Sequence, residues 1–175
     1  MQVVRKKLRQ NSMQTSEHEQ KCLRLLNQIG HPNIIRLLGS YTHQDTHYFL
    51  FPCMDMDIKV LLERQERFGD FKDDTTFFQA LRGLCSALMS THNLHLKQET
   101  HGVNFDGIGY HHDIRPANIL VSRSTFILAD FGLGNFKPSE QPSQTLWTQT
   151  MGDYLAPECM NATYESQDVT RAIDV

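Results

Sequence analysis

The sequence predicts an α+β fold, with strands concentrated in the first 52 residues and helices in most of the rest. Two observations lead to this prediction. Short runs rich in β-branched and aromatic residues fall before Pro52, and this is the composition of strands. After Pro52, the window 75–92 places apolar residues three and four positions apart, which is the spacing of an amphipathic helix. With 175 residues, the chain has the length of about one domain.

The first two elements are a strand and a helix. Residues 2–8 alternate weakly between apolar and polar types, which predicts a strand. A helix is expected to begin at Ser16, because Ser16 and Glu19 have the spacing of a capping box, in which both side chains bond the helix start. The run Gly30-His31-Pro32 is expected to end this helix.

The remaining elements are predicted from the same periodicities. In chain order they are two strands at 34–38 and 48–51 joined through 42–46, a short helix at 58–67, a long helix at 75–92, a loop insertion at 95–109, a hairpin of 119–121 with 126–128, and an exposed loop at 137–150. The segment 95–109 is interpreted as a loop because it is rich in Gly, Asn and Gln and shows no clear period.

Composition narrows the class of protein. Hydrophobic residues make up 39%, charged residues 21% and the net charge is -3, which is the balance of a soluble globular domain. No basic excess points to a nucleic-acid partner, and no apolar run is long enough to cross a membrane. No secretory signal is recognised, so a cytoplasmic or nuclear location is expected. The four cysteines are scattered, which predicts reduced thiols and no zinc site.

The most informative motifs are H-H-D-I-R-P-A-N at 111–118 and D-F-G at 130–132. They place Asp113, Arg115 and Asn118 at short fixed steps and a second aspartate, Asp130, 17 residues after the first. Phosphoryl transfer uses such a set, because a carboxylate orients the attacking hydroxyl, a cation neutralises charge, and oxygen donors hold Mg²⁺.

These motifs resemble the catalytic loop and the metal motif of eukaryotic protein kinases, H-R-D-L-K-P-x-N and D-F-G. Ala156-Pro157-Glu158 is similar to the A-P-E that closes the kinase activation segment. The resemblance implies an incomplete protein-kinase-like two-lobe fold. A partial β-rich N-lobe would span 1–52, and the hinge with a partial helical C-lobe would span 53–175. The Gly-rich loop and the last C-lobe helices of the family are not found in this sequence.

The resemblance also implies roles for the motif residues. Asp113 would be the base or hydroxyl-orienting carboxylate, and Asn118 and Asp130 would be the Mg²⁺ ligands. Arg115 stands where the family usually has lysine and would neutralise phosphate as a planar fork. The lysine that grips the ATP phosphates is predicted to be Lys6, with Lys7 as the alternative, since only one of two neighbours on a strand faces the cleft.

The glutamate that pairs with this lysine is harder to place. Counting back from His31-Pro32, the family position falls at Cys22, and Glu19 lies nearly one turn earlier. Either Glu19 reaches Lys6 through a shifted helix or the ion pair is missing. The missing pair is the favoured expectation.

The hinge that holds adenine is expected at Phe51-Pro52-Cys53. Because Pro52 has no N–H, the adenine contacts would use the Phe51 carbonyl and the Cys53 backbone. The resemblance further places Leu50 at the back of the pocket, Leu120 at its floor, and Asp57 within reach of the ribose.

His112 replaces the arginine that in many kinases binds a phosphorylated activation loop. A neutral imidazole is a poor anchor for a phosphate dianion near neutral pH. We therefore expect phosphorylation at Thr148 or Thr150 to have little effect on activity.

The predicted function is that of a protein kinase catalytic region, which transfers the γ-phosphoryl group of Mg-ATP to Ser or Thr of a protein substrate. A pseudokinase or interaction module that binds nucleotide without turnover is the first alternative, favoured by Cys22 and by the Gly-rich loop not being found. A truncated, marginally stable fragment is the second. A small-molecule phosphotransferase is disfavoured by A-P-E.

Overall fold

A computed structural model describes residues 2–8, 13–64, 71–98, 103–141, 145–146, 154 and 168–169. The predicted α+β class is confirmed, whereas the division at residue 52 stays a prediction. In chain order the elements are β1 (Val3–Lys7), α1 (Met13–Ile29), β2 (Gly39–His43), β3 (Thr46–Pro52), β4 (Met56–Asp57), α2 (Ile58–Glu63), α3 (Asp74–His92), β5 (Leu94–Gln98), β6 (Val103–Tyr110), the 3-10 turn η1 (Pro116–Asn118), β7 (Ile119–Ser122), β8 (Thr125–Leu128), β9 (Asn135–Pro138), β10 (Thr145–Leu146) and β11 (Asp168–Val169).

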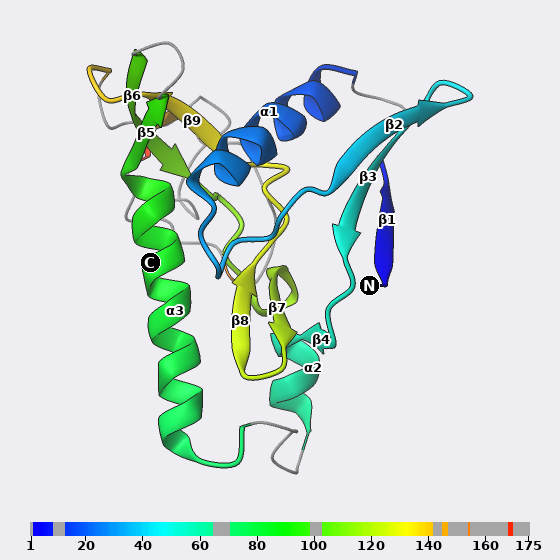
Figure 1. Ribbon diagram of the computed structural model, residues 1–175, viewed down its shortest axis with the longest axis vertical. Coiled ribbons are helices and arrows are strands. Elements are labelled where there is room, and N and C mark those ends of the chain that lie inside the picture. The colour runs from blue at the N-terminus through cyan, green and yellow to red at the C-terminus, as the bar shows by residue number, and fades with distance from the viewer. Residues whose placement is uncertain are drawn as a thin grey trace.

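The first sheet is antiparallel with the order β1-β3-β2. In Figure 1 this sheet lies to the right, α3 to the left, and α1 above the β7–β8 hairpin. Lys6 pairs with Phe49 and Val4 with Phe51, so these four residues point to one face of the sheet. Phe49 is only 2% exposed, which identifies that face as the one directed into the protein. The predicted strands at 2–8 and 48–51 are therefore confirmed.

Helix α1 begins at Met13, three residues earlier than expected. Ser16 consequently lies inside the helix, and the capping-box interpretation is wrong. The helix ends as predicted, because Gly30 adopts a left-handed φ of 64° and its N–H bonds the Leu26 carbonyl at 3.1 Å. One face is buried, with members at i, i+3, i+4 and i+7: Glu19, Cys22, Leu23 and Leu26.

The apolar run 34–38 is not a strand, contrary to the expectation; the strand lies at Gly39–His43. The run is held in an extended path by bonds to other parts of the chain. The Asn27 side chain bonds both the N–H and the carbonyl of Leu37, at 3.0 and 2.7 Å. The Ile35 N–H donates to the Leu128 carbonyl at 2.8 Å. Because those backbone groups are already used, bonding to β3 starts only at the last residue of the run, where the Leu38 N–H donates to the Leu50 carbonyl at 2.8 Å.

Below the first sheet, α2 and α3 pack against the antiparallel sheet β4-β7-β8. Both helices begin at aspartates: Asp57 caps α2 through the Val60 N–H, and Asp73 caps α3 through the Thr76 N–H. Two buried clusters form the core. One contains Leu8, Cys22, Leu23, Leu26, Ile34, Ile35, Leu37, Phe49, Ala87, Ile127, Leu128, Ala129 and Phe131. The other contains Ile58, Leu61, Phe71, Ala80, Ile119, Val121 and Phe126.

The described residues of the segment 95–109 form two paired antiparallel strands and not a loop. Strands β5 and β6 pair from Leu94 opposite Gly107 to Gln98 opposite Val103, and β6 pairs on its other side with β9. Glycine masks the strand pattern here for a steric reason. A Cβ at Gly109 would lie 2.4 Å from the Thr91 carbonyl and 2.5 Å from the Phe136 ring, so this strand position admits only glycine without a shift.

The turn between α1 and β2 is anchored to α3 by a neutral histidine. The Asn33 N–H donates to His31 Nδ1 at 3.1 Å, so the ring proton is on Nε2, which donates to Ser86 Oγ at 3.1 Å. Burial lowers the pKa of His31 below its ordinary value. Since the unfolded chain then binds the proton more readily, this group's contribution is full above the unfolded pKa of about 6.5 and declines as pH falls below it.

We therefore expect the free energy of unfolding to decrease as pH is lowered from 7.5 to 5.5. The His31→Asn variant should show a weaker decrease, because asparagine keeps an acceptor for the Asn33 N–H and does not titrate. Urea unfolding at four pH values checks this. Equal pH slopes for the two chains would show that His31 is not responsible.

Candidate functional site

A pocket of about 330 Å³ opens between the first sheet, α1 and the segment that follows β8. Its lining is mostly apolar, with charged groups at one end. The residues that line it are Val4, Lys6, Glu19, Leu23, Ile35, Phe51, Pro52, Met54, Met56, Ala117, Asn118, Leu120, Ala129 and Asp130. An apolar pocket with a few convergent polar groups is the usual form of a small-molecule site.

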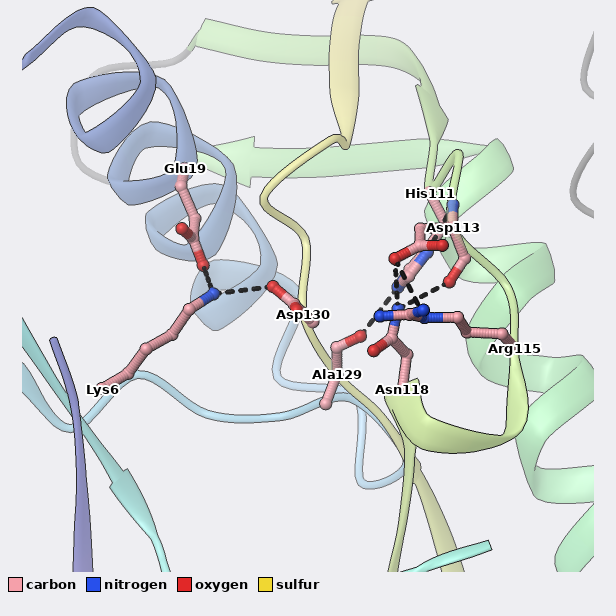
Figure 2. Close-up of polar contacts among 8 residues, drawn as sticks. All are labelled: Lys6, Glu19, His111, Asp113, Arg115, Asn118, Ala129 and Asp130. Carbon is pink, nitrogen blue, oxygen red and sulfur yellow. Dashed lines mark hydrogen bonds and ion pairs between the residues drawn. The ribbon is translucent and has the colours of Figure 1, made fainter. Parts of the chain in front are cut away.

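The charged end of the pocket is built on Lys6. Its Nζ lies 2.7 Å from Glu19 Oε1 and 2.6 Å from Asp130 Oδ1 (Figure 2). The expected absence of a lysine–glutamate pair is therefore wrong. Glu19 is not occupied in a capping box, since the helix begins at Met13, more than one turn before it, and it shares the buried face of α1 with Cys22. Lys7 is exposed on the other side of β1, which leaves Lys6 as the lysine in the pocket.

Burial and the charges of the neighbouring groups together shift the pKa values of Lys6, Glu19 and Asp130. Burial acts to lower the pKa of Lys6, but Glu19 and Asp130 outweigh it and the pKa is raised. Burial raises the pKa of Glu19 against the pull of Lys6. Burial also opposes ionisation of Asp130, yet Lys6 lowers the pKa of that carboxyl below its ordinary value. Near neutral pH one ammonium faces two carboxylates, so the trio carries a net negative charge that suits a cation.

The catalytic-loop motif is tied to the metal motif by His111. This fully buried side chain bonds the Ala129 carbonyl through Nε2 at 2.9 Å. Its Nδ1 accepts the Asp113 N–H at 3.3 Å, which places the ring proton on Nε2. The two aspartates that the sequence singled out are thus connected through one imidazole, because Ala129 directly precedes Asp130 (Figure 2).

Asn118 and Arg115 both contact the Asp113 side chain. Asn118 Nδ2 donates to the Asp113 carbonyl at 2.8 Å and to its Oδ2 at 2.6 Å. Arg115 Nε lies 3.4 Å from the same Oδ2. Because the amide nitrogen of Asn118 faces Asp113, its oxygen is the atom left for another partner, and Asn118 lines the pocket.

The D-F-G residues take different environments. Asp130 adopts a left-handed φ of 62°, which turns its carboxylate toward Lys6. Phe131 is fully buried and its ring lies 4.6 Å from that of His111. The aspartate is thus presented to the pocket while the phenylalanine fixes the segment in the core.

Only part of the predicted hinge lines the pocket, and its adenine contacts stay a prediction. The Cys53 N–H donates to the Gln2 carbonyl at 3.0 Å, which extends the β1–β3 pairing one residue past Pro52. The lining therefore includes Pro52 and Met54 in place of Cys53. Leu50 lies opposite Arg5, on the face of β3 that points away from the pocket.

Three other predicted pocket residues have different outcomes. Phe51 and Leu120 line the pocket, as expected for their positions. Asp57 is not among the lining residues; its carboxylate accepts the Val60 N–H at 2.9 Å as the cap of α2. Contact of Asp57 with a ribose stays a prediction. Ala156-Pro157-Glu158, Thr148 and Thr150 lie outside the described residues.

Sequence reasoning missed Met54, Met56 and the apolar wall formed by Val4 and Ile35. Val4 was within reach, because it lies two residues before Lys6 on the same strand and must share its face. Ile35 was assigned to a strand that does not form. Among the described helices, the structure contains none that combines the length and apolar character of a membrane span. Within the same residues no cluster of three or more His, Cys, Asp or Glu forms a metal site.

Both comparisons of this chain with known proteins find protein kinases. A family model described as protein kinase domain matches residues 1–175. The chain is 34% identical over 140 residues to "Cell division control protein 2 homolog 2" of Trypanosoma brucei brucei, covering 78% of this chain and 35% of that protein. It is 30% identical over 154 residues to "Cyclin-dependent kinase F-3" of Oryza sativa subsp. japonica, covering 87% of this chain and 30% of that protein. The chain spans about a third of the length of these curated relatives.

Proposed function

The chain belongs to the protein kinase family, and from that premise we propose that it transfers the γ-phosphoryl group of ATP to Ser or Thr hydroxyls of a protein substrate. The observation that carries the proposal is Lys6 bound to both Glu19 and Asp130. In protein kinases that ion pair and the D-F-G aspartate must both be in place for transfer. Their presence in this chain favours turnover over a pseudokinase.

The donor set fits a magnesium ion. Asp130 offers carboxylate oxygens and Asn118 an amide oxygen, which are the donors that hard cations take. Two protein ligands are few, but Mg²⁺ in such sites usually keeps waters and binds substrate phosphates as well. Bound there, the ion would neutralise charge on the phosphate oxygens.

The residues of the site then have separate roles in binding and transfer. Lys6 binds phosphate oxygens, while Glu19 holds its ammonium in place. Asp113 orients the substrate hydroxyl and accepts its proton; because Asn118 and Arg115 hold Oδ2, we assign this role to Oδ1. Arg115, whose side chain is 47% exposed, supplies positive charge near the transferred group. The apolar wall of the pocket, including Phe51 and Leu120, covers the adenine.

The first test replaces Asp130 by asparagine, which removes the charge and keeps the shape. We expect Mg-dependent ATP affinity to fall by at least about tenfold, since the ion loses its charged ligand. Phosphate transfer from radiolabelled ATP to a Ser/Thr peptide should fall in parallel. Thermal shift with ATP, with and without Mg²⁺, measures the binding.

Asp45→Asn serves as the matched control, because Asp45 lies in the exposed β2–β3 turn and makes the same change of charge. Mg-dependent binding without transfer by the unmodified chain would favour the pseudokinase alternative. No Mg-dependent shift in the unmodified chain would overturn the proposed function.

A further inference from the structure

One carbonyl group joins α1 to the segment after the metal motif. His18 Nε2 donates to the Gly134 carbonyl at 2.6 Å. The Cys22 thiol, one turn further along α1, donates to the same oxygen at 3.6 Å. Burial and the neighbouring Glu19 raise the pKa of Cys22 to about 12, so the thiol keeps its proton and remains a donor. We call these two contacts the Gly134 latch.

Gly134 is itself held in place on its other sides. Its N–H bonds the Phe131 carbonyl at 3.1 Å. A Cβ at this position would lie 3.2 Å from both the Phe131 and the Tyr110 carbonyls, so the backbone is packed against the strand that leads into the catalytic loop. The next residue, Asn135, pairs with Tyr110 at the start of β9. The acceptor of the latch is therefore fixed relative to Asp113 and Asp130.

The position of Glu19 follows from the latch. Glu19 lies between His18 and Cys22 in sequence, and Cys22 and Glu19 are three residues apart on the buried face of α1. A helix held at His18 and Cys22 cannot rotate about its axis without breaking the bonds to Gly134. Rotation is the motion that would carry the Glu19 carboxylate away from Lys6. The latch thus fixes the orientation in which the 2.7 Å ion pair forms.

The catalytic loop offers little alternative support for the orientation of α1. His112 stands at the step where the family has arginine, is 4% exposed and adopts a left-handed φ of 65°. Its ring packs edge-on against Tyr110, with 5.3 Å between the centroids. A buried imidazole packed against an aromatic ring is a poor anchor for a phosphate dianion.

We propose that His18, assisted by Cys22, is a positioning residue that holds α1 in the orientation that presents Glu19 to Lys6. This inference rests on the proposed function for its effect on nucleotide, while the latch itself is independent of that function. His18 does not line the pocket, so its effect on nucleotide passes through Glu19.

The experiment compares His18→Ala, His18→Gln and the control Lys21→Ala, an exposed position on α1. Glutamine can place an N–H donor near the position of Nε2, so it should restore the bond. In the nucleotide-free chain, amide hydrogen exchange over 17–29 should quicken roughly three- to tenfold in His18→Ala, the value of one hydrogen bond. His18→Gln and Lys21→Ala should exchange like the unmodified chain.

A double-mutant cycle tests the route to the site. His18→Ala should weaken Mg-ATP binding roughly three- to tenfold in the unmodified background and have no further effect in a Glu19→Gln background. The KM for ATP should rise by the same factor, and His18→Gln should recover it. Equal effects in both backgrounds, or unchanged exchange in His18→Ala, would overturn the proposal. If the unmodified chain binds no nucleotide, the proposed function fails, and the exchange measurement still decides whether the latch holds α1.

Discussion

In the Asp113→Asn variant, phosphate transfer to a Ser/Thr peptide is expected to fall by roughly 10²- to 10⁴-fold, the usual contribution of a positioned general base. Mg-ATP affinity should change by less than about twofold, because Asp113 is not among the residues that line the pocket. Asparagine keeps an oxygen for the Asn118 amide, so the loop geometry is expected to persist. Steady-state kinetics and ATP titration of the same preparation separate the two effects.

Asp106→Asn is the matched control for this variant. Asp106 lies on β6, the strand that leads into the catalytic loop, and its side chain is 60% exposed in a contact with His95. The change of charge is the same, and transfer should remain near the unmodified level. If Asp113→Asn retained transfer within about threefold, the hydroxyl-orienting role would have to pass to another group, and the proposed mechanism would fail.

The second large effect is expected at Glu19. Its carboxylate is 5% exposed and makes a charge-assisted bond to Lys6, of a kind that contributes about 1.5–3 kcal/mol. Glu19→Gln should therefore lower kcat/KM for ATP roughly ten- to a hundredfold. Lys6 would keep only the Asp130 contact, and its ammonium would compete with Mg²⁺ for that carboxylate.

The position of the carboxylate on α1 is expected to matter as much as its charge. Restoring a carboxylate as Cys22→Glu in the Glu19→Gln background should not recover activity, because Cys22 is 2% exposed and faces the Gly134 carbonyl, an acceptor that repels a carboxylate. Kinetics of the single and double variants with varied ATP test this. Recovery in the double variant would show that the family position at Cys22 is functional and that α1 shifts by a turn.

Much of the site was predictable from sequence because its residues belong to contiguous motifs. The loop 111–118 brings Asp113, Arg115 and Asn118 together by local geometry, and in the structure the side chains of Arg115 and Asn118 both contact that of Asp113. Strand alternation likewise predicted that Lys6 or Lys7, but not both, would face the pocket.

The errors have a common origin in backbone register that tertiary contacts set. The count back from His31-Pro32 selected Cys22, although a helical face also contains the residue three positions earlier, and the reach of Lys6 decides between them. Cys53 was expected to line the pocket but is not among the lining residues, and its N–H bonds the Gln2 carbonyl, from a distant part of the chain. Neither the Lys6–Glu19 contact nor the Cys53–Gln2 contact can be recognised from the local sequence.

The hairpin β5–β6 was missed for a different reason. Its strands carry Gly107 and Gly109, which weaken the pattern of alternate apolar residues. Gly109 is required because the Thr91 carbonyl at the end of α3 approaches it closely. Glycine in a strand is therefore evidence of close packing as well as of a loop, and sequence composition alone does not separate the two.

The burial of Cys22 gives it a different chemistry from the other two cysteines that the structure describes. A thiol whose pKa is about 12 holds almost no thiolate at physiological pH, and thiolate is the species that oxidants and alkylating reagents attack. Cys53 and Cys85, by contrast, are exposed. Oxidative damage would therefore reach Cys53, beside Pro52 and Met54, and Cys85 on α3 before it reached Cys22, and modification of Cys22 would indicate that α1 had separated from the core.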